Sequence, residues 1–198
     1  MIDISMTTFA DFVAATGPRR LTVVRNAKKT YGAGYDPRTD YWRPLRKGVA
    51  DAFTPKGYDP NVLSAVVAGT TDAKKLDNYR ACVEGIERWA GKRAFSAGAT
   101  QKQRWSTDEL AVGVNPELIA TIDGAPYVVK LYFKSDPLSK ARVDSLLALL
   151  QATHGDRGTV GVLDIRRSKL YEPTREIPDL GALLNGEAAA FARIWDGV

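Results

Sequence analysis

The segment from Glu117 to Phe133 restricts the fold of this chain more than any other. Apolar side chains occupy every second position of its first half, at Leu118, Ala120 and Ile122. This period-2 pattern is typical of a strand with one buried face. Asp123-Gly124, a turn dipeptide that tolerates positive φ, follows, and a β-branched and aromatic run then fills residues 127–133. The segment therefore predicts a β-hairpin.

A lysine lies inside the second strand of this hairpin. Side chains alternate across a strand, so one face should carry Val128, Lys130 and Tyr132, and the other Val129, Leu131 and Phe133. A buried lysine is costly unless it is paired. Glu117, at the start of the adjacent strand, is the expected partner.

The residues Asn115-Pro116-Glu117 and Val128-Val129-Lys130 resemble the motif of the PD-(D/E)XK superfamily, the restriction-endonuclease-like nucleases. In that family a Pro-Asp opens one strand and an acid-x-Lys lies on the next. The carboxylates hold a divalent metal, and the lysine helps to position or activate the attacking water. The resemblance implies Glu117 and Lys130 as catalytic residues and Glu117 as a Mg²⁺ ligand. Val128 stands where the second acid belongs, and valine cannot ligate a metal, so the motif is degenerate.

An active site of this kind would need a carboxylate from elsewhere, since two or more acids usually hold such a metal. Asp123, Asp164 and Glu84 are the candidates. Asp164 ends a buried strand, where clefts often lie, but it could equally cap a turn or pair with the adjacent Arg166 or Arg167. The alternative without catalysis is a structural Glu117–Lys130 pair.

Glu84 has its own alternative interpretation. Arg80, Glu84 and Arg88 fall at i, i+4 and i+8 of the expected helix, which is the spacing of an exposed ion-pair ladder.

The remaining patterns predict an α/β fold. Helices are expected at residues 7–16 (capped by Thr8), 41–53, 61–68, 72–90, 136–154 (capped by Asp136) and 179–196, the last broken near Asn185-Gly186. Strands are expected at 21–24, 109–114 and 159–165, and loops at 26–40 and 92–104. From residue 72 the order is helix, three strands, helix, strand, which the resembling family shares. We expect a mixed sheet flanked by helices, with a restriction-endonuclease-like core.

Charge divides the chain unevenly. Residues 1–104 carry 18 basic and 10 acidic residues, whereas residues 105–198 carry 10 and 13. We expect a basic, mostly helical N-terminal region at residues 1–70 and the α/β core with a C-terminal helix at 71–198, together forming one compact unit. The basic first half favours a polyanionic partner.

Cations and aromatic residues interleave in the N-terminal region. The candidate nucleic-acid-binding residues are Lys28, Lys29, Arg38, Arg43, Arg46 and Lys47. Cations neutralise phosphates and aromatic faces can stack on bases, so we predict nucleic acid, DNA in the first instance, as the partner. The alternatives are a solvated basic surface around buried aromatics, and a non-enzymatic interaction module that meets an acidic protein.

Several classes of site are excluded by composition. Cys82 is the only cysteine and His154 the only histidine, which excludes an intramolecular disulfide, Cys-rich zinc sites and His-cluster metal sites. Mg²⁺ is the one cofactor implied, and only by the resemblance. No signal-like segment or membrane-length apolar run is present, so we expect a cytoplasmic protein with no membrane partner.

Overall fold

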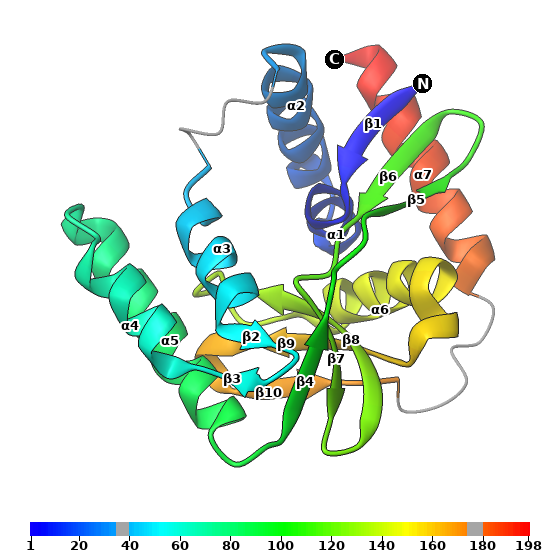
Figure 1. Cartoon of the computed structure of the whole chain (residues 1–198). Helices are drawn as coiled ribbons and strands as arrows, with labels where there is room; N and C mark the ends of the chain where they lie inside the picture. The colour runs from blue at the N-terminus through cyan, green and yellow to red at the C-terminus, as the bar shows by residue number, and fades with distance from the viewer. Residues whose placement is uncertain (35–39, 174–179) are drawn as a thin grey trace.

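A computed structural model of the chain describes residues 1–34, 40–173 and 180–198. Its larger sheet has five strands in the order β10-β9-β8-β7-β4 (Figure 1). These strands are β4 (Phe95–Gly98), β7 (Leu118–Ile122), β8 (Ala125–Tyr132), β9 (Thr159–Asp164) and β10 (Lys169–Tyr171). β4, β7 and β8 form an antiparallel meander, whereas β8 and β9 are parallel. A parallel pair needs a crossover connection, and helix α6 (Lys140–His154) supplies it.

The predicted hairpin is present as β7 and β8. Asp123 and Gly124 form its turn with φ of 50° and 89°, the positive values that a two-residue hairpin turn requires. Leu118 pairs with Val129, and Ile122 with Ala125. This register directs alternate side chains to opposite faces of the sheet, as the sequence predicts.

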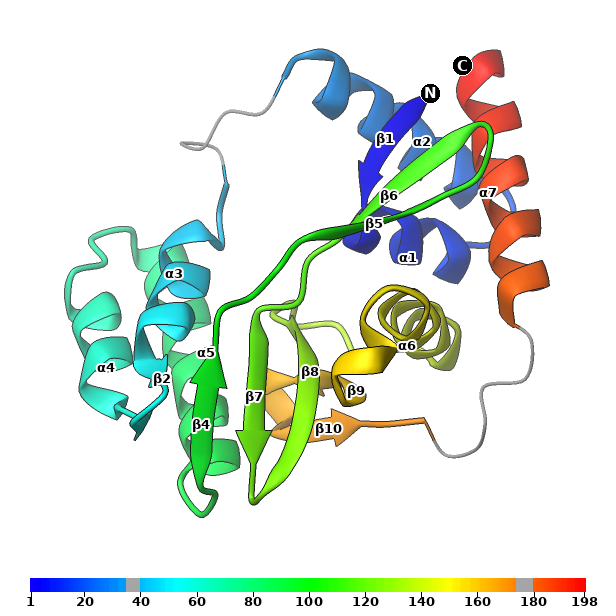
Figure 2. The same ribbon diagram turned by 45° about the vertical axis from the view of Figure 1, so that its right-hand side comes forward.

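Helices cover both faces of the five-stranded sheet (Figure 2). On one face α5 (Ala73–Ala90) packs through residues such as Cys82 and Ile86 against an apolar cluster that includes Val129 and Leu131, which we call the α5-side core. On the other face lies the α6-side core, whose sheet residues include Val128, Val160 and Val162 and whose helix residues include Leu146 and Leu147. Both leucines are buried, as expected. The molecule is thus a mixed α/β fold.

A second, three-stranded sheet extends the α6-side core. Its strands are β1 (Ile2–Ser5), β6 (Leu110–Val114) and β5 (Gln103–Ser106), in the order β1-β6-β5. The helices whose buried residues join this core are α1 (Met6–Ala14), α2 (Pro18–Gly32) and α7 (Leu180–Gly197). Because β1 pairs with β6 and α1 shares a core with α6, residues 1–34 are packed into the same body as the later residues.

The rest of the N-terminal region belongs to the α5-side core. It comprises α3 (Arg43–Ala52), β2 (Phe53–Thr54), β3 (Gly57–Tyr58) and α4 (Pro60–Ala68). Asp59 caps α4 through its side chain, and Asp72 caps α5 in the same way. The helices expected at 41–53, 61–68 and 72–90 are therefore confirmed, with ends that differ by one or two residues.

The strand expected at 21–24 is wrong, because these residues lie inside α2. Pro18 begins this helix, since proline suits a first helical position. Val24 and Ala27 are the buried residues of α2, at helical spacing. The loop expected at 26–40 is wrong as far as Gly32, and its residues 35–39 lie outside the described part of the chain.

The loop expected at 92–104 is also wrong in part, because β4 and β5 lie there. Phe95 and Ala97 are buried while Ser96 and Gly98 are exposed, a strand alternation hidden by small side chains. The strand expected at 109–114 is present as β6, but in the smaller sheet rather than beside the hairpin.

Two helix starts and one helix break also differ from expectation. Ser5, not Thr8, caps α1 and accepts the Thr8 N–H. Ser139, not Asp136, caps α6, and its neighbours Leu138 and Val143 join one apolar cluster in the positions of a hydrophobic staple. α7 is continuous through residues 185–186 because its packed residues outweigh the cost of one glycine, roughly 1 kcal/mol.

Candidate functional site

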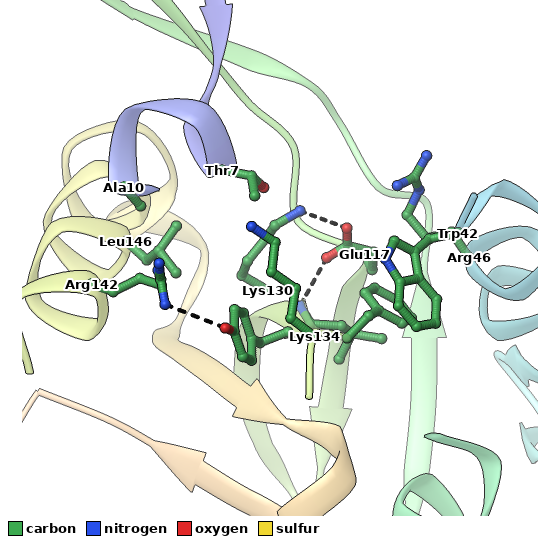
Figure 3. A pocket seen from close by; sticks show the side chains of 12 residues that line it. Thr7, Ala10, Trp42, Arg46, Glu117, Lys130, Lys134, Arg142 and Leu146 are labelled. Carbon is green, nitrogen blue, oxygen red and sulfur yellow. Dashed lines mark hydrogen bonds and ion pairs between the residues drawn. The ribbon is translucent and has the colours of Figure 1, made fainter. Parts of the chain in front are cut away.

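The centre of the candidate site is the ion pair between Glu117 and Lys130. Glu117 immediately precedes β7, and its N–H donates to Val129 O at 3.2 Å, which extends the hairpin register by one residue. Lys130 therefore lies opposite Glu117, and its Nζ donates to Glu117 Oε1 at 2.6 Å. Figure 3 shows the two side chains pointing toward one another. The expected ion pair is confirmed.

The pair is almost fully withdrawn from solvent and well satisfied. The Glu117 and Lys130 side chains are 6% and 11% exposed. Lys130 Nζ also donates to Asn115 O at 3.1 Å, and Glu117 Oε2 accepts the Leu131 N–H at 2.8 Å. Buried charges are tolerated when they are paired and their remaining hydrogen bonds are made. Both oxygens of the Glu117 carboxylate are therefore already engaged.

A small pocket of about 80 Å³ adjoins this pair (Figure 3). The first turns of α1, the start of α3, the end of β8 and α6 enclose it. Its lining residues are Thr7, Ala10, Trp42, Arg46, Glu117, Lys130, Leu131, Tyr132, Phe133, Lys134, Arg142 and Leu146. Among these residues Arg46, Lys130, Lys134 and Arg142 are basic, and Glu117 alone is acidic.

Carboxylates behind the lining hold the pocket cations in place. Asp11 of α1 binds Lys134 Nζ at 2.6 Å and Arg142 Nη2 at 3.0 Å. Arg46 pairs with Asp40. Arg142 Nη1 also donates to the Tyr132 hydroxyl at 3.3 Å. Burial raises the pKa of Tyr132, although Arg142 opposes the shift, so this hydroxyl stays protonated at neutral pH.

Val128 contributes no ligand to this site. It shares a face of β8 with Lys130, as expected, but lies opposite Ile119 and is 0% exposed within the α6-side core. The position of the second motif acid is therefore filled by packed hydrocarbon.

The acids considered as replacements lie elsewhere. Asp164 is fully buried, and its carboxylate accepts the backbone N–H of Arg167 at 3.3 Å and the Nη1 of Arg167 at 3.0 Å. It therefore has the capping and pairing role that the sequence left open. Asp123 forms the hairpin turn and accepts the Ala94 N–H at 2.8 Å. Glu84 is exposed on α5. None of these three lines the pocket.

The residues present do not fit a Mg²⁺ ion. Such an ion is held by carboxylates, carbonyls and water, and cations would repel it. The described lining residues offer one carboxylate, whose oxygens are engaged, beside four basic side chains. Across residues 1–34, 40–173 and 180–198, no three His, Cys, Asp or Glu side chains gather as a metal site.

The candidate nucleic-acid-binding residues are divided among several places. Lys28 Nζ donates to the oxygens of Trp195 and Val198, at 2.8 and 2.7 Å, so it anchors the end of α7. Lys29, Arg43 and Lys47 are exposed, and Lys47 pairs with Asp51. Of the five candidates that the structure describes, Arg46 alone lines the pocket. Arg38 lies outside the described residues.

The aromatic residues of the same stretch serve mainly in packing. Trp42 stacks on Tyr79 and Phe133, and the Tyr41 hydroxyl donates to Lys74 O at 2.9 Å. The Tyr31 hydroxyl bonds the first turn of α1. These contacts agree with the alternative interpretation, in which a solvated basic surface surrounds buried aromatic residues.

Three polar residues of the pocket, Thr7, Lys134 and Arg142, were not predicted from the sequence. Lys134 continues the period-2 series of Lys130 and Tyr132, so strand alternation could have indicated it. Thr7 and Arg142 reach the site only because α1 and α6 pack beside the end of β8. No local pattern signals that packing.

No protein-family model matches this chain, and no curated protein is similar to it in sequence. Within the described residues, every helix is too short or too polar to cross a lipid bilayer.

Proposed function

We propose that this chain is a nucleic-acid-binding protein on a restriction-endonuclease-like scaffold, and that it binds phosphate groups without a metal. One observation carries the proposal. Glu117 and Lys130 meet across a hairpin at a pocket where the other charged side chains among the described lining residues, Arg46, Lys134 and Arg142, are all basic. Basic side chains that converge on a solvent-connected pocket suit a phosphate oxygen.

The order of elements supports the scaffold. When β5 and β6 are set aside, α5, β4, β7, β8, α6 and β9 run as helix, three strands, helix and strand, and all four strands lie in one mixed sheet. β4 takes the place in this order that was expected for residues 109–114. The β5–β6 hairpin is an insertion between the first two of these strands. Glu117 and Lys130 occupy the positions that the resembling family gives to the first acid and the lysine.

The same site argues against cleavage. Metal-dependent nucleases need carboxylates, and Val128 removes one of them. An active nuclease with a relocated acid would require a free carboxylate at the pocket, but Asp11 is already paired with Lys134 and Arg142. The remaining alternative is an interaction module that binds an acidic protein. It would use the same positively charged side chains as the nucleic-acid proposal, but they would bind carboxylates instead of phosphates.

Binding of labelled single- and double-stranded oligonucleotides, measured by fluorescence anisotropy in EDTA, tests the proposal. We expect binding that weakens steeply between about 50 and about 200 mM salt. Arg46→Gln with Lys134→Gln removes the two most exposed pocket cations. On double-stranded DNA it should make the slope of log K against log salt shallower by about 1.8, at about 0.9 per phosphate.

Lys56→Gln with Lys92→Gln is the matched control, because both lysines are exposed and outside the pocket. It should leave the slope unchanged. Absence of binding to DNA and RNA at low salt would contradict the proposal, as would binding that requires Mg²⁺. Equal competition by polyglutamate and by DNA would favour the acidic-protein alternative.

A further inference from the structure

Helix α2 concentrates positive charge. It contains five basic residues and no acidic residue. The basic residues are Arg19, Arg20, Arg25, Lys28 and Lys29. Each of these side chains is either paired with a neighbouring element or exposed as part of a charged surface. Their contacts show which of the five belong to each group.

Two of the five cations are used inside the protein. Arg20 pairs with Glu187 of α7 at 2.9 Å and lies over the Phe12 ring. Lys28 binds the end of α7 through Trp195 O and Val198 O. These contacts fix α2 against α7, which lies next to it (Figure 2).

The other three cations are exposed. The side chains of Arg19, Arg25 and Lys29 make no hydrogen bond or ion pair with any residue of the described ranges. At 3.6 residues per turn they share roughly a third of the helix circumference and span about 15 Å along its axis. Thr22 and Asn26, exposed and uncharged, lie between them. The outer face of α2 is therefore basic and polar without a compensating acid.

We infer that this face, which we define by Arg19, Arg25 and Lys29, binds the phosphate backbone of nucleic acid. The inference rests on the proposed function and assigns a second contact surface to the same partner. Cations without intramolecular partners gain most from phosphate, because binding them releases condensed counterions. Threonine and asparagine side chains between them add hydrogen bonds to phosphate oxygens.

The face does not suit a lipid surface. A helix that lies in a membrane interface needs a broad apolar face toward the lipid. The apolar residues Val23, Val24 and Ala27 of α2 instead pack into the α6-side core. Leu21 is the one aliphatic side chain of α2 that is substantially exposed.

α2 is also attached to the turn that lines the pocket. The Tyr31 hydroxyl accepts the Ser5 N–H at 2.9 Å and bonds Thr8 Oγ1 at 3.0 Å. Thr7, between these residues, lines the pocket. Tyr31 lies on the side of α2 opposite the basic face, and no residue of α2 lines the pocket, so the two are separate contact surfaces.

The test compares the α2 variant, its control and the Arg46→Gln, Lys134→Gln variant in the same anisotropy titration. Arg19→Gln, Arg25→Gln and Lys29→Gln together remove the face, and glutamine keeps a helix propensity close to that of the basic residues. For the α2 variant we expect the slope of log K against log salt on double-stranded DNA to become shallower by about 2.7, at about 0.9 per phosphate. The control, Lys56→Gln, Lys92→Gln and Lys169→Gln, removes equal charge from exposed positions outside α2 and should keep the wild-type slope.

The outcomes separate the two proposals. If the α2 variant binds like wild type while Arg46→Gln with Lys134→Gln loses affinity, the inference about α2 is wrong and the proposed function stands. If the slope of log K against log salt becomes shallower by the same amount in the α2 variant and in its control, net charge explains the binding and the assigned face is wrong. If wild type binds phosphatidylserine vesicles through α2 but not oligonucleotides, a membrane surface replaces nucleic acid and both proposals fail.

Discussion

Lys130 Nζ and Glu117 Oε1 lie 2.6 Å apart on neighbouring strands, and both side chains are nearly buried. The next residue along β8, Leu131, donates its N–H to the other oxygen of the same carboxylate. Glu117 therefore links two consecutive residues of β8 to the start of β7. In this chain the carboxylate closes one end of the hairpin.

Removing one member of this pair should therefore destabilise the protein. Lys130→Met leaves the Glu117 carboxylate buried without its counter-charge, and we expect a loss of roughly 3–5 kcal/mol in the free energy of unfolding. Glu117→Gln with Lys130→Met should cost much less than the sum of the single changes, because no charge is left unpaired. Urea denaturation measures all three.

The exposed pair of Lys140 and Asp144 provides a control for this measurement. Its lysine side chain is 88% exposed, and Lys140→Met should change stability by less than about 0.5 kcal/mol. A Lys130→Met effect as small as this would show that the buried pair contributes nothing measurable.

Val128→Glu tests the degenerate motif. The wild type should show no Mg²⁺- or Mn²⁺-dependent nuclease activity. The substitution places a carboxylate in an apolar core, so it should lower Tm, as should the uncharged control Val128→Gln. Mn²⁺ should leave the Tm of both variants unchanged, because both Glu117 oxygens are already engaged and basic side chains line the pocket. A rise in Tm with Mn²⁺ for Val128→Glu alone would instead reveal a vestigial metal site, and metal-dependent cleavage by wild type would contradict the degenerate motif.

Gly85 allows α5 to approach the short helix η2 (Ile165–Arg167). A Cβ built on Gly85 would lie 1.7 Å from Ile165 O, and the Ser168 hydroxyl donates to Gly85 O at 2.8 Å. Gly85→Ala should therefore destabilise the protein by about 1–3 kcal/mol, the usual cost of overpacking.

Gly186 of α7 is the matched control for Gly85. Nothing lies within 4 Å of its Cβ position, so Gly186→Ala should stabilise by roughly 0.5–1 kcal/mol. Thermal or urea unfolding of the two variants should give shifts of opposite sign. A neutral Gly85→Ala would mean that α5 and η2 are farther apart.

Cys82 should be unreactive in the native protein. Burial raises the pKa of its thiol from 9.0 to about 12, although Arg166 opposes the shift. Iodoacetamide should label it slowly at pH 8 in buffer and rapidly in urea, since the thiolate is the nucleophile. Rapid labelling of the native protein would contradict this burial.

The same shift predicts a pH dependence of stability. Between about pH 9 and pH 12 the unfolded thiol loses its proton while the folded thiol keeps it, so the free energy of unfolding falls as pH rises. Tyr58 and Tyr79, whose pKa values burial raises to about 12, act in the same direction above pH 10. Cys82→Ala should remove the thiol contribution, and identical profiles for variant and wild type would contradict it.

Local sequence patterns were sufficient to predict the hairpin, α5, α6 and the buried strand β9. Each carries its own signal, namely alternation about Asp123-Gly124 or apolar residues at helical spacing. These patterns also predicted the Glu117–Lys130 pair, because strand alternation and a two-residue turn place these residues opposite each other. Local periodicity is sufficient for contacts that follow from register.

Local periodicity does not encode which elements pack against each other, and this packing fixed the remaining features of the fold and the site. The run around Val23 and Val24 favours a strand locally, but it forms part of a helix because one side of α2 packs into the α6-side core. Lys134 and Arg142 meet at Asp11 only because α1 lies against α6. A chain pattern specifies which face of an element is apolar, whereas the neighbour that covers the face depends on how all the elements pack together. For that reason the sequence predicted the ion pair, and the pocket beside it emerged only from the packing of α1, α3 and α6.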